Sequence, residues 1–375
     1  MALMPLNYPP FDHWVWLIPA FMIGACIGSF LNVVIYRVPL GMSVNKPKRS
    51  FCPLCKNQLP IWQNLPIVSW LFLRGKCAHC SAPIPFRYIA VEIVTAVLFT
   101  LVWWIFPPHV AIFLWVLMAL LVAITWIDAE HFIIPTNLTW AGSAIGLIAC
   151  AVWPQISSLS GYVDLWWEGL LRGAIGWIVG YFGLWAVVEG GKKLFGKRSM
   201  KFDKEVEWFL REPTNDVDPM HFVIDGVEVP WWEIFFRKTD RLIVDATEVV
   251  LDGKETGAGQ LVIRETGIEL SDGRTFELEN MVSLSGKARG AVIPREAMGK
   301  GDIHLLGMIG AFFGFSAVFL SLFAASIFAL VAALIGRIGF GKPLPFGPFL
   351  AMGAVAWMFG GWRLWQMYME FVGFN

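Results

Sequence analysis

Charged residues are scarce in this chain. Only 15% of its 375 residues are Asp, Glu, Lys or Arg, and 57% are hydrophobic. Soluble globular proteins carry about 25% charged residues. The apolar residues also come in long blocks, which is the pattern of membrane helices. The composition argues against an ordinary soluble protein and predicts an all-α polytopic membrane protein.

The chain also has no net charge, but the two signs are separated along it. Segment 37–87 has eight Lys and Arg and no acidic residue, whereas segment 199–292 has nineteen acidic and eleven basic residues, a net charge of −8. The basic segment is short and lies between two apolar runs, so no nucleic-acid partner is indicated. We expect a basic loop and an acidic inserted domain.

A basic segment before the first apolar run is absent as well. The chain starts Met1–Ala2–Leu3–Met4–Pro5, which lacks the positive start of a cleavable signal peptide. We expect the first apolar run to stay in the lipid bilayer.

The apolar runs predict about eight transmembrane helices. Gly307, Gly310 and Gly314 interrupt one run that is too long for a single helix, so we expect a short helix followed by a longer one there. The expected helices are roughly 14–36, 88–106, 110–127, 137–153, 169–188, the two parts of 303–335, and 349–369.

These runs divide the chain into five parts. They are a first span (1–36), a cysteine-containing loop (37–87), spans two to five (88–198), a soluble insert (199–292) and the last three spans (293–375). With eight spans, the loop, the basic cluster 192–198 and Arg337 with Lys342 fall on one side, which the positive-inside rule makes cytoplasmic. Both termini would then face outward.

The insert has the pattern of a small β-rich domain. Asp272–Gly273 is typical of a hairpin turn. Trp208, Trp231, Trp232 and Phe235 are expected in its core. The predicted strands are 242–244, 248–251, 261–264, 267–270 and 275–278.

Four of the six cysteines form two Cys-x-x-Cys pairs. Cys52 and Cys55 are separated from Cys77 and Cys80 by twenty-one residues, a spacing that fits one zinc ion held by four thiolates. Such a zinc would be structural, because four sulfurs leave no position for water. The alternative is two disulfides or unused thiols, although a cytoplasmic loop is a reducing environment.

Two aspartates lie at the ends of apolar runs, where charge is costly. Asp128 closes one run and Asp302 opens another. Two adjacent carboxylates can share a proton and activate water, which predicts an intramembrane aspartic peptidase. The alternative is that each aspartate caps a helix, and the spacing alone does not decide between them.

Two glutamates and two glycines complete the candidate set. Glu130 competes with Asp128 but is expected closer to water. Glu92 is a third buried acid, whose alternative role is to pair with Arg87 or Arg37. Gly299 and Gly301 come shortly before Asp302, and glycines there would let another backbone come close.

The motifs around the aspartates resemble a known family. Asp128-x6-Pro135 and Gly301–Asp302-x-His304 are similar to the two active-site motifs of the bacterial type IV prepilin peptidases, membrane aspartic proteases of the Gly-x-Gly-Asp group. Further segments that resemble this family in the same order are 28–37, 49–55, 64–70, 74–77, 87–92 and 345–351.

The resemblance implies two activities in one chain. Asp128 and Asp302 would be the catalytic pair that cuts the leader from prepilins or type II secretion pseudopilins, on the cytoplasmic side of the bacterial inner membrane. The new N-terminal amine would then be methylated with S-adenosylmethionine, a step linked to the zinc loop. A Gly-x-Gly-x-x-Gly strand–helix unit is absent, so the methyl donor rests on the resemblance alone.

Three features depart from the family. His304 replaces a usual Lys, which puts the pH range and substrate binding in question, although Gly301 and His304 remain candidate supporting residues. Glu130 stands where Asp is common. Segment 199–292 replaces a short loop and could recognise substrate, dock pilus or secretion assembly components, or only decorate the loop.

Two other function classes stay open from the sequence. The chain could keep the fold with only the peptidase or only the methyltransferase active. It could instead be a non-enzymatic membrane scaffold or transporter with a zinc knuckle and a sensor domain. The few polar residues within the apolar runs disfavour a transporter.

Overall fold

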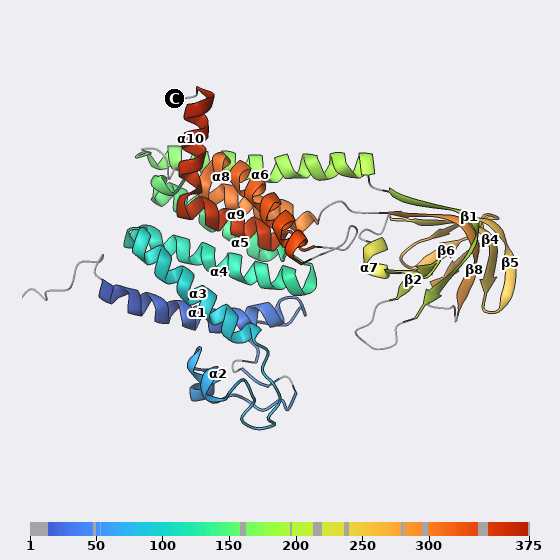
Figure 1. Ribbon diagram of the computed structural model, residues 1–375, viewed down its shortest axis with the longest axis horizontal. Coiled ribbons are helices and arrows are strands. Elements are labelled where there is room, and N and C mark those ends of the chain that lie inside the picture. Colours follow the sequence, from blue (N-terminus) through green and yellow to red (C-terminus); the bar gives the residue numbers. More distant parts are fainter. Residues whose placement is uncertain are drawn as a thin grey trace, which may run out of the picture. The chain divides into compact units, whose positions relative to one another are not determined.

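The structure is a computed structural model that describes residues 14–47, 50–52, 54–157, 163–195, 197–212, 220–235, 240–278, 281, 283–294, 299–336 and 344–373. The chain divides into two compact units. One contains residues 1–185 and 299–375 and the other contains residues 186–298. The first is helical and the second is built on a β-sheet (Figure 1).

The helical unit is a bundle of apolar helices. A 3-10 turn, Trp14–Trp16, precedes α1 (Leu17–Arg37), which packs against α3 (Arg87–Ile105) and α4 (Pro108–His131). Two glycines on α1 explain the close approach to α3. A Cβ on Gly24 would lie 2.7 Å from the Cα of Ala96, and one on Gly28 would lie 2.7 Å from the Cα of Glu92. Small residues spaced four apart on one helix face are typical of such close packing.

The second half of the bundle is built around α8 (Lys300–Ile335). It packs between α5 (Thr136–Val152) and α9 (Gly347–Ala356), while α4 contacts both α5 and α9. On its other side lies α6 (Trp166–Phe195), where Gly176 and Gly310 bring the two backbones together. The remaining elements of the unit are 3-10 turns at Ile61–Asn64 and Pro154–Ser157, α2 (Val68–Phe72), a π-helical turn at Trp357–Gly361, and α10 (Trp362–Val372).

The expected number of eight spans is too high. Among the described residues, five helices are long and apolar enough to cross a membrane, and α5 is a shorter apolar helix of 17 residues. The expected span 349–369 is not one helix: α9 has ten residues, Gly360 adopts a positive φ of 139°, and α10 buries none of its side chains. The glycine pair at 360–361 breaks the helix, because only glycine enters such a conformation readily.

The expected break within 303–335 occurs at Gly314. This residue has φ 76° and ψ −176° inside α8. A Cβ on Gly310 would lie 2.9 Å from a methyl group of Val318, although eight residues of straight helix span about 12 Å. The chain therefore bends sharply at Gly314, between a shorter helical part and a longer one.

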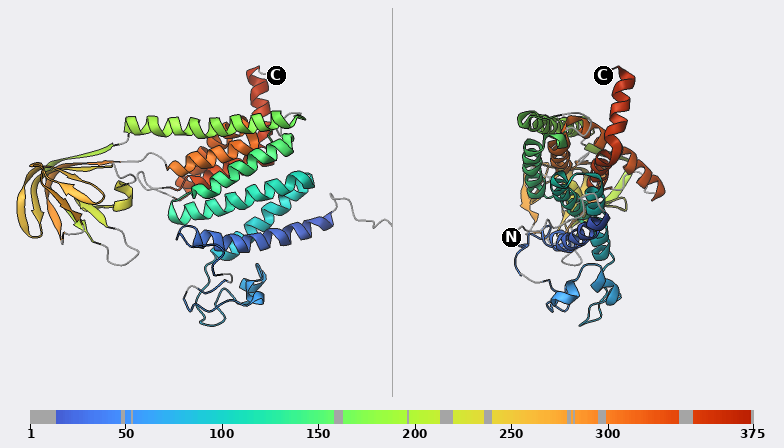
Figure 2. Two further views of the ribbon diagram at one scale, coloured as in Figure 1. Left: turned by 180° about the vertical axis from the view of Figure 1, so that it is seen from behind. Right: turned by 90° about the vertical axis from the view of Figure 1, so that its left-hand side faces the viewer.

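The second unit is an eight-stranded antiparallel sheet. The strands are β1 (Lys197–Arg211), β2 (His221–Ile224), β3 (Val227–Pro230), β4 (Leu242–Leu251), β5 (Lys254–Ile263), β6 (Gly267–Glu269), β7 (Thr275–Glu277) and β8 (Leu284–Pro294). Their order in the sheet is β3-β2-β1-β8-β4-β5-β6-β7. Figure 2 shows the twisted strands of this sheet from the opposite side. The short helix α7 (Trp231–Ile234) follows β3.

The core of the sheet unit holds most of the aromatic residues expected there. Trp208 is 1% exposed and Phe235 is buried, while Trp231 packs against them partly buried. The side chain of Trp232 lies outside the described residues. The Asp272–Gly273 turn joins β6 and β7, with Gly273 at φ 86°. The predicted strands 242–244 and 248–251 are parts of one bulged strand, β4. The sequence did not predict β1, β2, β3 and β8.

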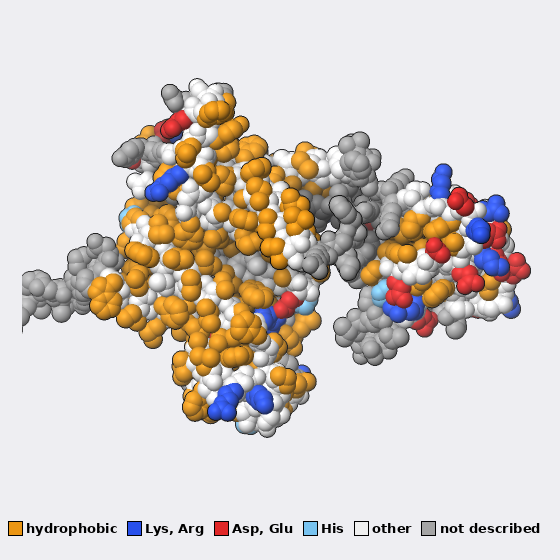
Figure 3. Space-filling view, viewed as in Figure 1, with side chains coloured by type: hydrophobic (Ala, Val, Ile, Leu, Met, Phe, Trp, Pro, Cys, Tyr) orange, Lys and Arg blue, Asp and Glu red, His pale blue; other side chains and the backbone are white. Residues whose placement is uncertain are grey.

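The two units differ in surface chemistry. Apolar side chains cover the visible face of the helical unit, and charged side chains of both signs are dense on the sheet unit (Figure 3). On the helical unit, Lys and Arg gather on the cysteine loop. A surface that is apolar over a bundle of long helices is what lipid contact requires, so the chain is a multi-pass membrane protein.

Candidate functional site

Asp128 lies in the last turn of α4 and is 5% exposed. Its Oδ2 accepts a hydrogen bond of 2.9 Å from the backbone N–H of Gly347, the first residue of α9. The N-terminus of a helix carries partial positive charge, so α9 presents a favourable dipole to this carboxylate. A residue with a Cβ could not replace Gly347 without displacement, because that Cβ would lie 2.6 Å from Oδ2.

Asp302 lies in the first turn of α8 and is 6% exposed. The N-cap of this helix is Gly299, and no side chain caps it. Asp128 is at the C-terminal end of its own helix, and Pro135 is the N-cap of α5. Neither aspartate is therefore the N-cap residue of its own helix, although Asp128 accepts a hydrogen bond from the first N–H of α9.

The two aspartates approach each other where three helix ends meet. Gly301, the neighbour of Asp302, and Gly347, the partner of Asp128, both pack against one residue. Ile134, in the loop after α4, fixes this junction: a Cβ on Gly301 would lie 2.5 Å from the Cβ of Ile134, and one on Gly347 would lie 3.0 Å from its Cδ1. Gly301 is thus required for close approach, whereas Gly299 has more room.

A buried pair of carboxylates has a defined chemical capacity. Two adjacent negative charges in a water-poor site are unfavourable, so such a pair can hold one proton between them. One group then accepts a proton while the other donates one. This arrangement suits hydrolysis by an activated water.

His304 does not join this junction. Its ring lies among aromatic side chains, 5.1 Å from the ring of Tyr181 in an edge-to-face arrangement and 5.7 Å from that of Trp140. Two positions after Asp302, it faces the α5 and α6 side of α8. His304 departs from the family pattern, but its side chain packs among aromatic rings and not at the aspartate junction.

The acidic side chains near Asp128 have other partners. Glu130 forms a salt bridge with Arg87, and its side chain is 35% exposed, as expected for the acid closer to water. Glu92 pairs with neither Arg87 nor Arg37, so its alternative role is wrong. Its Oε2 instead accepts a hydrogen bond of 2.7 Å from the N–H of Ile67, while Arg37 donates to the carbonyls of Ser43, Val44 and Pro47.

The four loop cysteines form one cluster. All six cysteines of the chain lie within the described residues and are free, so the disulfide alternative is wrong. The sulfurs of Cys52, Cys55, Cys77 and Cys80 all lie within 4.8 Å of one another, and those of Cys52 and Cys80 are 3.9 Å apart. Zinc–sulfur bonds of about 2.3 Å in a tetrahedron place sulfurs roughly 3.8 Å apart, so the cluster fits a metal ion.

The two Cys-x-x-Cys turns have the same backbone. In the first, the N–H of Cys52 donates to the carbonyl of Asn57, and Lys56 has φ 58°. In the second, the N–H of Cys77 donates to the carbonyl of Ala82, and Ser81 has φ 57°. Each turn thus presents two sulfurs in the same way, and the two turns together complete a four-sulfur site.

The backbone also prepares one of these sulfurs to bind a metal. N–H groups of Cys80 and His79 donate toward Cys77 and lower the pKa of its thiol to about 6. Metals bind the thiolate rather than the thiol. His79 contributes here through its backbone.

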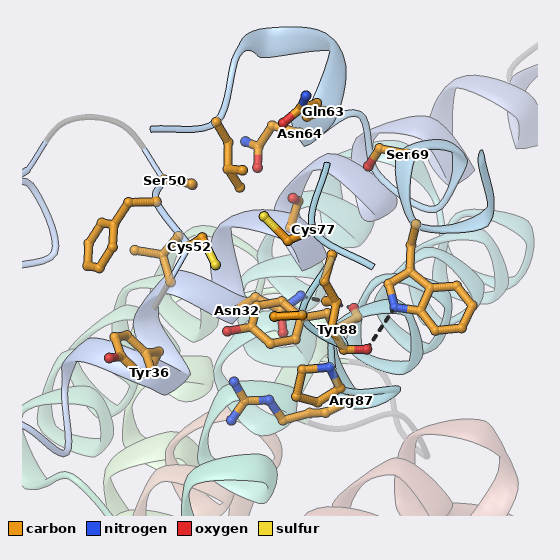
Figure 4. Close-up of a pocket in the computed structure, with 18 of the residues that line it drawn as sticks. Asn32, Tyr36, Ser50, Cys52, Gln63, Asn64, Ser69, Cys77, Arg87 and Tyr88 are labelled. Atoms are coloured by element: carbon orange, nitrogen blue, oxygen red, sulfur yellow. Dashed lines mark hydrogen bonds between the residues drawn. The ribbon is translucent and has the colours of Figure 1, made fainter. Parts of the chain in front are cut away.

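A cavity of about 690 Å³ lies between the cysteine loop and the helices α1 and α3 (Figure 4). Its floor is formed by side chains of the helices, including Asn32, Tyr88 and Arg87. Its opposite side is formed by the loop, including Gln63 and Cys77. The cavity is a second chemical centre in the helical unit.

Sequence reasoning missed three contributors to these sites. Gly347 acts on Asp128 through its backbone, Ile134 acts by shape, and the buried Asn32 faces the cavity from α1. Segments 28–37 and 345–351 resembled the family, which marked Asn32 and Gly347 as part of a motif. Nothing in those segments indicated what the two residues contact.

Comparison with known proteins gives the family. A family model described as the bacterial peptidase A24 N-terminal domain matches residues 22–106, and one described as the type IV leader peptidase family matches residues 271–334. The first match contains the cysteine loop and the second contains Asp302, while Asp128 lies between the two.

Several curated relatives carry the name prepilin leader peptidase/N-methyltransferase. That of Neisseria gonorrhoeae is 36% identical over 205 residues, which are 48% of this chain and 68% of the relative. That of Myxococcus xanthus (strain DK1622) is 43% identical over 131 residues, 34% of this chain and only 38% of the relative. That of Burkholderia pseudomallei (strain 1026b) is 25% identical over 375 residues, 91% of this chain and 84% of the relative.

No solved structure matches the chain significantly. The family rests on the two family models and on relatives such as that of Neisseria gonorrhoeae, which aligns over more than two thirds of its length. This chain belongs to the bacterial peptidase A24 family, that of the prepilin leader peptidases/N-methyltransferases.

Proposed function

We propose that this chain cleaves the leader peptide of prepilins or pseudopilins and then methylates the new amino terminus. The observation that carries the proposal is the junction of Asp128 and Asp302. Two buried carboxylates, brought together by the ends of α4 and α8, lie in a chain of the A24 peptidase family.

In the cleavage step the two carboxylates share the proton transfers. One takes a proton from a water molecule as the water oxygen bonds to the carbon of the scissile peptide carbonyl. The peptide C–N bond then breaks, and the leaving nitrogen takes a proton from the other carboxyl group. The products are a leader with a new carboxyl end and a mature chain with a new amine. The pair acts jointly, so the two roles are not divided between Asp128 and Asp302.

The other groups at the junction position this pair. The N–H of Gly347 holds Oδ2 of Asp128, and the contact between Gly301 and Ile134 sets how closely α8 approaches the end of α4. Catalytic geometry of this kind tolerates little displacement.

The cysteine cluster supports a structural zinc site. Cys52, Cys55, Cys77 and Cys80 would hold the ion, and with four sulfur ligands it would have no position for a reacting water. Among its described residues, the segment 50–86 has little regular structure, with a 3-10 turn at Ile61–Asn64 and α2. A metal ion would therefore supply much of the stability of its fold.

The methylation step uses the product of the cleavage. S-adenosylmethionine supplies a methyl group on a positively charged sulfur. The nitrogen lone pair of the new amine forms a bond to the methyl carbon, the C–S bond breaks with its electrons on sulfur, and one proton leaves the nitrogen. The cavity beside the cysteine loop is of a suitable size for a small-molecule ligand, because such pockets are roughly 300–1,000 Å³.

The location follows from the charge distribution. We place the protein in the bacterial inner membrane, with the basic cysteine loop, both aspartates and the insert facing the cytoplasm. Its partners are the lipid bilayer and prepilin substrates. The sheet unit is a candidate surface for pilus or secretion assembly components, and no nucleic acid is involved.

The test is mass spectrometry of a prepilin peptide after incubation with purified protein, with and without S-adenosylmethionine. The proposal predicts loss of the leader without the donor, and the added mass of one methyl group with it. Failure of a folded protein to cut several different prepilins would overturn the cleavage proposal. Cleavage without methyl addition would overturn the methylation proposal alone.

A further inference from the structure

The cavity beside the cysteine loop contains hydrogen-bond acceptors that have no partner. The side chain of Asn32 is 4% exposed, and its Oδ1 is buried without a hydrogen bond. Across the cavity, Gln63 is 9% exposed and its Oε1 is also unpaired. Burying an acceptor without a partner is unfavourable, so these two oxygens indicate that a ligand with N–H groups completes the site.

The orientation of Asn32 is fixed by a neighbour. Its Nδ2 donates a hydrogen bond of 3.0 Å to the carbonyl of Tyr88 on α3. An amide oxygen cannot donate to a carbonyl, so the oxygen is the atom left unpaired. Figure 4 shows Asn32 beside Tyr88 on the helix side of the cavity, with Gln63 on the loop side.

A carboxylate lies on the same wall as Asn32. Glu92 is 8% exposed and lines the cavity one helical turn after Tyr88. Its Oε2 accepts from Ile67, and Ser29 also bonds to the carboxylate. A carboxylate has about four acceptor positions, so two bonds leave capacity for a ligand.

The cationic groups that line the cavity are already engaged. Arg37 donates to three backbone carbonyls, and Arg87 pairs with Glu130. Arg87 retains one buried unpaired donor, its Nε. Among the buried side-chain atoms of this lining, two oxygens and one N–H have no partner, and Glu92 adds a carboxylate, which favours a ligand that is cationic and carries N–H donors.

We propose that this wall binds the primary amine created by leader cleavage, with Asn32 Oδ1 accepting one of its N–H groups and Glu92 balancing its charge. Gln63 accepts a further N–H of the same ligand from the loop side. The inference rests on the proposed function, since cleavage supplies the amine and the bound amine is the acceptor in methyl transfer. The cavity then holds the amine within reach of the cysteine loop, which explains why that loop and the methylation belong together.

The experiment measures peptide binding to the full-length detergent-solubilised protein, without the methyl donor. One peptide has a free mature-type amino terminus, and the other is the same peptide with an acetylated terminus. Wild type should bind the free amine at least tenfold more tightly, since hydrogen bonds to a charged group contribute about a factor of ten or more. Equal affinity for the two peptides would overturn the proposal.

Substitutions locate the amine. Asn32→Leu should reduce the preference for the free amine about tenfold, and Asn32→Asp, which adds charge beside the amine, should increase it. Asn137→Leu places the same change at an exposed position on α5, outside the cavity lining, and should leave the preference unaltered. If Asn32→Leu and Asn32→Asp both bind like wild type, the amine is not at this wall.

A second substitution keeps the proposal testable where Asn32→Leu does not fold. Glu92→Gln can still accept from Ile67 but lacks the charge, so it should lower the preference for the free amine. Glu370→Gln, at an exposed position on α10, is its matched control. A Glu92→Gln protein with bound metal, normal cleavage and an undiminished preference contradicts the inference.

The same samples separate this inference from the proposed function. A protein that prefers the free amine but transfers no methyl group contradicts the methylation proposal and supports the binding site. A protein that methylates normally in both Asn32→Leu and Glu92→Gln confirms methylation and overturns the site.

Discussion

The two chemical centres of the helical unit are built in opposite ways. The aspartates come from residues 174 positions apart and meet only because α4, α8 and α9 pack with their ends together. The cysteine cluster is assembled from two short turns within one loop, each closed by its own backbone hydrogen bonds. The first centre depends on tertiary packing in the membrane, and the second depends on local geometry and, in our proposal, on a metal ion. Damage to one should therefore leave the other working.

Substitution of the aspartates should cause the largest difference between the two activities. Asp128→Asn and Asp302→Asn each remove one of the two proton-transferring groups, so each should lower the cleavage rate by about 10³-fold or more. Metal content and methylation of a pre-cleaved peptide should stay unchanged. Cleavage is followed by mass spectrometry, with the exposed Asp164→Asn as a control. Wild-type cleavage in either aspartate variant contradicts the catalytic pair.

Substitution of the cysteines should have the opposite effect, with methylation lost and cleavage retained. Cys52→Ser or Cys77→Ser removes one of four sulfur ligands, so the protein should lose bound zinc, and methylation should fall with it. Cleavage should persist, because neither Asp128 nor Asp302 is among the residues that line the cavity beside the loop. Elemental analysis of the purified protein measures the metal. A wild-type protein that binds no zinc would refute this prediction.

A smaller effect is expected from the backbone contact to Asp128. The added methyl group in Gly347→Ala meets Oδ2, so the carboxylate must move, and cleavage should slow by about 10- to 100-fold. Gly183→Ala is the matched control, because a Cβ there meets nothing within 4 Å. Equal cleavage rates in the two variants would show that this contact does not position the carboxylate.

A still smaller effect is expected from His304. Its ring contacts Tyr181 and Trp140 rather than the aspartate junction. His304→Phe preserves the aromatic contacts and should change the cleavage rate by no more than about threefold, with an unchanged pH profile. The rate is measured from about pH 5 to pH 8. A lost or displaced pH limb in the variant would place His304 in the chemistry.

The smallest effect on cleavage is expected from the sheet unit. The sheet has its own buried core of eighteen hydrophobic residues and forms a separate compact unit. Replacing residues 199–292 with a short linker should leave peptide-bond cleavage intact. Loss of cleavage in a deletion protein that retains bound metal would make the insert part of the active machinery.

The sequence predicts best what depends on short-range chemistry. The two Cys-x-x-Cys pairs indicate one four-sulfur cluster, because each pair defines a local turn. The Asp272–Gly273 hairpin is predicted for the same reason. Gly24 and Gly28 also predict the close packing of α1 on α3, because helix periodicity places them on one face.

The sequence predicts poorly what depends on tertiary contacts. The N–H of Gly347 donates to Asp128, which is 219 positions away in the sequence. Because glycine has no side chain, its residue type gives no sign of this hydrogen bond. The helix count is too high because the last apolar run breaks at Gly360. Strands β1 and β8 were missed because β1 is rich in charged residues and β8 in Gly, Ala and Ser, so neither has the usual strand composition. Their pairing in the centre of the sheet overrides that weak local preference.

The central claim is that one chain holds two separable reactions. The direct measurement is mass spectrometry of a prepilin peptide incubated with S-adenosylmethionine and wild type, Asp128→Asn or Cys52→Ser. The account predicts a shortened and methylated product with wild type, an uncut peptide with Asp128→Asn, and a shortened but unmethylated product with Cys52→Ser. Loss of cleavage with Cys52→Ser in a stable membrane-inserted protein, or cleavage with Asp128→Asn, would contradict it.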